Sequence, residues 1–163
     1  MAMREVFLFK LFLDLQKSYD TLDWDIRLEI IAAYVVIPRT LRILQTYWYH
    51  LTMVARAGGY FGLPFKGCRG VTQLDPMSPT IFNVVVVSVI RHWVTVVAAT
   101  KKGVEGLDLF IRYLAPNFYA NNGLIASPQP NIMQRAFDIL AGLFDQVGIH
   151  TNTRKVASMA FHP

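Results

Sequence analysis

An apolar run near the start of the chain, residues 6–14, reads VFLFKLFLD and limits the folds that the chain can adopt. A short run rich in β-forming apolar residues is typical of a buried strand at the centre of a sheet. The run ends in a carboxylate, Asp14. We therefore expect a central strand that carries a functional group at its C-terminal end.

The patterns that follow predict helices and further strands around this strand. Apolar spacing, caps and leading prolines favour a helix after residues 20–25, a helix over residues 38–57, a core helix through residues 80–99 and a helix over residues 131–148. Strands are expected within residues 58–70, in a hairpin of residues 109–114 with 123–127, and in residues 149–161. The order β-α-α-β-α-ββ-α-β predicts an α+β fold, an antiparallel sheet with helices packed on one face.

Composition limits the class of protein and its partners. The chain is 53% hydrophobic and only 17% charged, so it can bury a large core and leaves apolar surface that a partner could cover. The net charge of +5 permits a polyanionic partner. The single cysteine, Cys68, allows no disulfide within the chain and favours a reducing, intracellular compartment. The most membrane-like run, residues 80–99, is interrupted by Arg91 and His92, so we expect a buried helix and no membrane partner.

Three stretches occur in an order that is typical of one enzyme family. They are FLDLQKSYDTLD at residues 12–23, RGVTQLDPMSPTIFN at residues 69–83 and FYANNGLIAS at residues 118–127. Together they resemble the palm domain of reverse transcriptases of the retroelement and group II intron type. The closing stretch, residues 144–159, resembles the next family block. The resemblance implies a single palm domain over residues 1–163, without the fingers and thumb of the family.

The resemblance also implies a vestigial catalytic site. In the family, carboxylates from the first strand and from a Tyr-x-Asp-Asp hairpin hold two divalent cations. Asp14 matches the first of these positions, but the hairpin reads Tyr119-Ala120-Asn121-Asn122. Two negative charges are replaced by weakly ligating amides, so we expect that the Mg²⁺ pair is lost and that Asp14 is a metal ligand in outline only.

Other residues match family positions that contact nucleotide or template. The matching residues are Leu15, Tyr19, Arg69, Gln73, Ser78, Asn83 and Tyr119, and Lys155 matches a lysine proposed to protonate the leaving pyrophosphate. Tyr19 has the alternative role of a core tyrosine, and Lys155 that of a solvated lysine at a strand end. Leu74, Met77 and Pro116 depart from the family pattern, which favours drift after the loss of catalysis.

Three functions follow from this resemblance, in order of preference. The first is a pseudoenzyme, an inactive palm whose exposed apolar faces bind a protein partner. The second is weak, electrostatic binding of a nucleic acid. The third is an RNA-directed DNA polymerase fragment, either weakly active or engineered at its two asparagines.

Overall fold

The computed structural model describes residues 8–34, 37–72, 75–99 and 116–161. The chain divides into two compact units, which we describe separately. We call Met1–Ser18 with Val86–Pro163 the sheet unit, and Tyr19–Val85 the helical unit. The described elements are β1 (Leu8–Gln16), α1 (Ser18–Thr21), α2 (Trp24–Tyr34), α3 (Pro38–His50), β2 (Thr52–Ala57), β3 (Tyr60–Lys66), α4 (Ser78–Ala99), β4 (Asn117–Tyr119), β5 (Asn122–Ser127), α6 (Pro130–Gln146), β6 (His150–Thr151) and β7 (Ala157–Phe161). The single-domain expectation stays a prediction.

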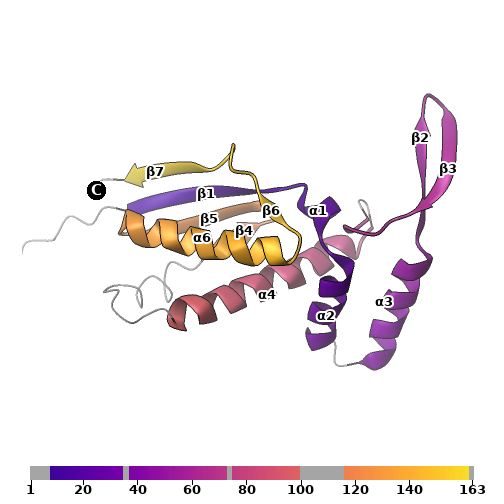
Figure 1. Ribbon diagram of the computed structural model, residues 1–163, viewed down its shortest axis with the longest axis horizontal. Helices are drawn as coiled ribbons and strands as arrows, with labels where there is room; N and C mark the ends of the chain where they lie inside the picture. The colour runs from indigo at the N-terminus through magenta and orange to yellow at the C-terminus, as the bar shows by residue number, and fades with distance from the viewer. Residues whose placement is uncertain (1–7, 35–36, 73–74, 100–115, 162–163) are drawn as a thin grey trace, which may run out of the picture. The chain divides into compact units, whose positions relative to one another are not determined.

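The sheet unit is built around β1, as the apolar run predicts. The strand order is β4-β5-β1-β6, and β7 also pairs with β1. β1 pairs with β5 along one edge and with β6 and β7 along the other, in each case antiparallel (Figure 1). The expected α+β class with an antiparallel sheet is therefore confirmed.

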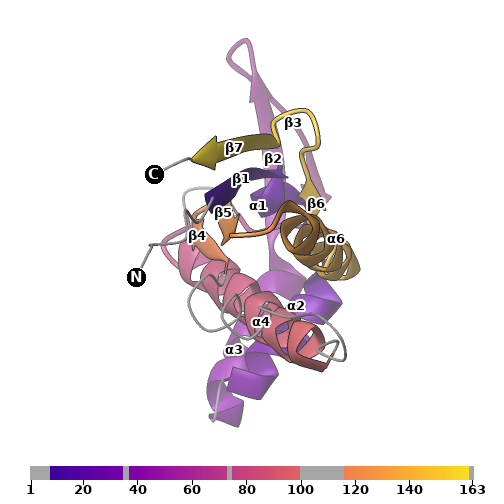
Figure 2. The same cartoon turned by 90° about the vertical axis from the view of Figure 1, so that its left-hand side faces the viewer.

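Within the described part of the sheet unit, helices cover one face of this sheet, and no helix covers the other face, which we call the open face. Leu11, Leu13 and Leu15 of β1 are buried, and Leu11 lies opposite the buried Ile125 of β5. The part of α4 that belongs to the sheet unit and the whole of α6 lie on the same side of the sheet in both views (Figures 1 and 2). The indole Nε1 of Trp93 in α4 donates a hydrogen bond of 2.8 Å to the carbonyl of Ala136 in α6. Helix packing on one face is thus confirmed.

α4 is helical although it is rich in β-branched residues. Its buried residues recur with helical spacing and form one stripe: Ile81, Phe82, Val85, Val86, Val89, Trp93 and Val97. Arg91, His92 and Thr95 are exposed. By length and composition alone α4 could also cross a membrane, a test that buried core helices pass as well. The continuous buried stripe is what a core helix requires.

The prediction of one helix over residues 38–57 is wrong beyond His50. Residues 52–57 form β2, which pairs antiparallel with β3 from Thr52↔Lys66 to Ala57↔Tyr60. Gly58 and Gly59 adopt φ angles of 57° and 86° and make the turn. A left-handed glycine pair closes a tight hairpin at little cost, and the strand pairing then overrides the helical spacing of the preceding residues.

The predicted helix over residues 131–148 and the predicted strand structure in residues 149–161 are confirmed by α6, β6 and β7. Gly148, with a φ of 78°, follows the end of α6 as predicted. Residues 149–161 contribute β6 and β7 with a turn between them. Of the predicted central hairpin, residues 123–127 fall in β5, but the strand that pairs with β5 across the asparagine turn is β4, Asn117–Tyr119. Residues 109–114 lie outside the described part of the chain. Pro116 lies directly before β4, so it removes no hydrogen-bond donor from that strand.

The backbone of Gly70 forms hydrogen bonds to several residues of the helical unit. Its N–H donates a hydrogen bond of 2.8 Å to the Leu22 carbonyl. Its carbonyl accepts from Trp24 Nε1 at 2.7 Å and from Arg27 Nη1 at 2.8 Å. Gly70 has a φ of +81°, and an added Cβ would lie 2.6 Å from the carbonyl oxygen of Tyr19. Only glycine suits this position.

We predict that Gly70→Ala lowers the free energy of unfolding by about 2–4 kcal/mol, because it combines overpacking with a strained φ. Urea denaturation followed by circular dichroism measures the change. The control is Gly142→Ala in α6, where an added Cβ meets nothing within 4 Å. That substitution should stabilise the chain by up to about 1 kcal/mol, because alanine favours helix. Equal effects of the two substitutions would contradict the role of Gly70.

Candidate functional site

Asp14 and the asparagine pair meet on the open face of the sheet. β1 and β5 pair so that Asp14 lies opposite Asn122. The turn before Asn122 is tight, since Ala120 adopts a φ of 51°. The N–H of Leu15 donates a hydrogen bond of 2.8 Å to the carbonyl of Asn121. The expected placement of Asp14 beside the asparagine turn is therefore what the structure has.

Three side chains converge on the Asp14 carboxylate. Its Oδ1 accepts a hydrogen bond of 3.2 Å from Asn121 Nδ2. Its Oδ2 accepts one of 3.1 Å from Asn152 Nδ2 and lies 3.3 Å from Lys155 Nζ. The amide of Asn122 extends the set by donating to Asn121 Oδ1 at 3.3 Å. Both oxygens of this carboxylate, whose side chain is only 14% exposed, are therefore paired within the chain.

The turn between β6 and β7 brings Asn152 and Lys155 to the site. Thr151 of β6 pairs with Leu15, and the N–H of Asn152 donates a hydrogen bond of 2.8 Å to the Asp14 carbonyl. The N–H of Lys155 then donates a hydrogen bond of 2.9 Å to the Asn152 carbonyl, and this bond closes the turn. Asn152 is absent from the predicted site residues. Asn152 lies in the closing stretch, residues 144–159, and the resemblance of that stretch to a family block was the signal that could have found it.

The donors around Asp14 do not suit a pair of divalent cations. Mg²⁺ and similar hard cations bind oxygen ligands, and a two-cation site needs several negative charges. Here a single carboxylate faces two amide N–H₂ groups and an ammonium group. Within the described residues, no group of at least three His, Cys, Asp or Glu side chains could hold a metal ion. We name the group of Asp14, Asn121, Asn122, Asn152 and Lys155 the Asp14 cluster.

The other predicted site residues are divided between the two units. Tyr119 precedes the turn and is 86% exposed, whereas the side chain of Leu15 is buried. In the helical unit, the Tyr19 ring stacks on Phe82 with centroids 4.7 Å apart. Ser78 is buried and its hydroxyl donates to the Thr72 carbonyl at 2.7 Å.

Three predicted template contacts remain. Arg69 and Asn83 are exposed, and Arg69 forms a β-bridge with Asp23. Gln73 lies outside the described residues. The proposed contacts of all these residues with nucleotide or template stay predictions.

Comparisons with known proteins bear on the fold and the family. Residues 8–161 match a family model described as reverse transcriptase (RNA-dependent DNA polymerase). No curated protein matches the chain. The structure is similar to that of Candida tropicalis telomerase in complex with an RNA fragment, with a TM-score of 0.72 and 12% identity over 96% of this chain and 26% of that one.

Two further telomerase structures are similar. The apo enzyme of Candida tropicalis gives a TM-score of 0.69 and 13% identity over 95% of this chain and 31% of that one. Candida albicans telomerase with an RNA fragment gives a TM-score of 0.62 and 18% identity over 93% of this chain and 27% of that one. The chain therefore spans less than a third of each of these structures.

We predict unequal energetic roles within the Asp14 cluster. Asn152→Ala removes a hydrogen bond to a largely buried carboxylate and should lower the free energy of unfolding by about 1–2 kcal/mol. Lys155→Met removes an ion pair whose lysine side chain is 67% exposed. It should cost less than about 1 kcal/mol and even less in high salt. Denaturant titrations at two salt concentrations measure both, and a larger cost for Lys155→Met would overturn this ranking.

Proposed function

The chain belongs to the reverse transcriptase family, and we propose that it is a member without polymerase chemistry that acts as a binding module. The observation that carries the proposal is the Asp14 cluster. In it, the carboxylate at the end of β1 is paired with Asn121, Asn152 and Lys155. These groups occupy the oxygens that two-metal chemistry would need for cations.

Charge supports the loss of two-metal chemistry. Two unit charges 4 Å apart interact by about 4 kcal/mol near a protein surface, so replacing one carboxylate by an amide removes roughly 8 kcal/mol of attraction for a dication at that distance. Asn121 and Asn122 represent two such replacements relative to the Tyr-x-Asp-Asp motif. The nearby Lys155 adds a repelling positive charge. Two dications at this site would therefore lack the negative charge that offsets their mutual repulsion.

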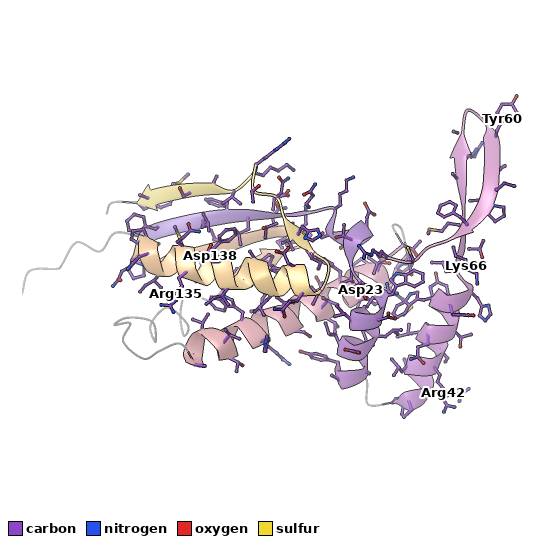
Figure 3. The ribbon with its side chains drawn as sticks, in the orientation of Figure 1. Asp23, Arg42, Tyr60, Lys66, Arg135 and Asp138 are labelled. Atoms are coloured by element: carbon purple, nitrogen blue, oxygen red, sulfur yellow. The ribbon has the colours of Figure 1, made fainter. Side chains whose placement is uncertain are left out.

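The β2–β3 hairpin supports a role in binding a protein. Every residue of β3 is exposed, and Tyr60, Phe61 and Leu63 are 83%, 72% and 88% exposed. Figure 3 shows Tyr60 at the tip of the hairpin. A two-stranded ribbon is marginally stable in water, and a contiguous apolar surface marks an interaction site. A protein that covers the hairpin would both stabilise it and bury these side chains.

A second function, nucleic-acid binding, is favoured by cations placed on aromatic rings. Arg56 lies over the Phe61 ring at 5.4 Å, and Lys66 lies over the Tyr49 ring at 4.9 Å. Residues 52–66 contain no carboxylate. Aromatic and basic groups together form the surfaces on which unpaired bases stack. Two of the similar telomerase structures are complexes with an RNA fragment.

We predict that restoring two carboxylates makes the site sensitive to Mg²⁺. Asn121→Asp combined with Asn122→Asp should lower Tm in the absence of metal, because the new charges repel Asp14, and added Mg²⁺ should raise Tm again. The unchanged chain should show no such response. A thermal-unfolding series in Mg²⁺ measures this, with Asn117→Asp, an exposed position on β4, as the control for added charge. A Tm increase with Mg²⁺ in the unchanged chain that Asp14→Asn abolishes would refute the proposal.

We predict that two single substitutions separate the binding functions. Leu63→Glu places a charge on the exposed hairpin and should abolish capture of a protein partner from nuclease-treated lysate, whereas Arg69→Ala should leave it intact. In fluorescence anisotropy with single-stranded RNA, Arg69→Ala should weaken binding to all sequences alike and reduce the salt slope by about 1. Capture that depends on Arg69 and disappears with nuclease would favour the nucleic-acid function instead.

A further inference from the structure

A stripe of exposed side chains runs along the outer face of α3 in the helical unit. Its members recur at the spacing of one helix face and line a hollow of about 430 Å³: Arg39, Arg42, Ile43, Thr46 and Tyr47. We call these residues the α3 stripe, and we propose that it binds an acidic amphipathic helix of a protein partner. Figure 3 labels Arg42 on α3, outside the β2–β3 hairpin, so the site is separate from the binding role proposed for the hairpin.

The opposite face of α3 packs within the helical unit. Leu44 and Trp48 are the buried residues of this helix, and the Trp48 ring lies 3.6 Å from Arg27 Cζ of α2. Each residue of a helix turns the chain by about 100°, so the α3 stripe lies on the side that faces away from this packing. Ile43 and Tyr47, one turn apart at the centre of that side, are 59% and 43% exposed. An apolar pair in this position is available to a docking helix.

The charge around the α3 stripe is entirely positive. The chain has 16 Lys and Arg residues and 11 Asp and Glu residues, and residues 30–74 contain five of the basic residues and none of the acidic ones. The rest of the chain therefore holds 11 of each, and the whole net charge of +5 belongs to the segment that contains α3. Within the described part of the chain, no carboxylate pairs with Arg39 or Arg42. An acidic partner is the electrostatic complement of this surface.

The apolar centre of the α3 stripe favours a protein over other polyanions. Most of the wall of the hollow is apolar, and protein interfaces combine an apolar centre with a charged rim. Two arginines neutralise only about two phosphates, which gives a nucleic acid little affinity at physiological salt. A membrane surface requires a larger apolar face than one isoleucine and one tyrosine provide.

A helix is the partner element that matches the spacing of the stripe. Two helices pack by fitting rows of side chains three and four residues apart into each other's grooves. The arginines at positions 39 and 42 precede Ile43 and Tyr47 along α3. The partner helix should therefore carry apolar residues three and four apart, with carboxylates beside them that reach Arg39 and Arg42.

The test uses the whole chain and a synthetic helical peptide of the same length as α3, with leucines three and four residues apart and glutamates elsewhere. We expect fluorescence anisotropy to give a Kd on the order of 10 μM. The analogue with glutamine in place of glutamate should bind at least tenfold more weakly. Amide NMR signals that shift on binding should belong to the α3 stripe and its neighbours on α3.

Three outcomes overturn the proposal. The first is the absence of peptide binding at about 1 mM. The second is equal binding of the glutamine analogue, which would remove the argument from charge. The third is displacement of the peptide by a lower concentration of oligouridylate, or of vesicles of phosphatidylcholine and phosphatidylserine, which would assign the stripe to a nucleic acid or to a membrane.

Two substitutions with matched controls locate the binding site. Ile43→Ser should weaken peptide binding about tenfold, because it removes a side chain that the partner buries. Arg42→Gln should weaken it about threefold, as expected for a charge at the rim. Leu63→Ser on the hairpin and Arg154→Gln in the β6–β7 turn change exposed residues outside the stripe and should leave binding unchanged.

All four positions are exposed, so each variant should keep the Tm of the unchanged chain. Equal losses from Ile43→Ser and Leu63→Ser, or from the two arginine substitutions, would show attraction without a defined site and overturn the proposal. Loss from Leu63→Ser alone would place the peptide on the hairpin, which overturns this proposal and leaves the binding role of the hairpin standing.

Discussion

Antiparallel pairing along both edges of β1 fixes where every group of the Asp14 cluster lies. One edge is paired with β5 from Phe9↔Ser127 to Asp14↔Asn122, and the other with β7 and β6. Side chains alternate between the faces of a strand, so a slip of one residue would bury Asp14 and expose the leucines. Burial of Leu11 and Leu13 therefore enforces the register that places Asp14 on the open face.

The same pairing builds a hydrogen-bonded network around Asp14. The β4–β5 turn delivers Asn121, and the β6–β7 turn delivers Asn152 and Lys155, to one carboxylate. In a two-metal enzyme these turns would surround cations with negative oxygens. Here they surround one negative group with donors, and the result is a closed network that links three segments of the chain. The proposed loss of polymerase chemistry and the stability of this corner of the sheet have the same cause.

Local sequence patterns predicted those helices and strands that a short stretch of sequence identifies without its partners in the fold. The apolar run of β1, the long apolar stretch of α4 and the periodicity of α6 each identify their own structure. The spacing of the family motifs also identified Asp14 and both asparagines as neighbours. By contrast, the helical spacing of residues 38–57 predicts helix where the structure has β2, because only pairing with β3 decides between the two states.

Long-range contacts explain what the sequence could not indicate. Asn152 reaches Asp14 across 138 positions of the chain. Arg27 is bound to Gly70, 43 residues away, and this contact leaves the other edge of its guanidinium unpaired. Nothing in the pattern around Arg27 distinguishes it from an exposed helical arginine. Its burial follows from where α3 and Gly70 lie around it.

We propose that donors within the chain, and not cations, neutralise Asp14. Crystals of the unchanged chain soaked in Mn²⁺, with anomalous diffraction recorded near the manganese absorption edge, test this claim directly. We expect Lys155 and Asn152 to remain on the Asp14 carboxylate, with no manganese peak beside it. Two manganese peaks about 4 Å apart next to Asp14, with Lys155 displaced, would show that cations neutralise this carboxylate.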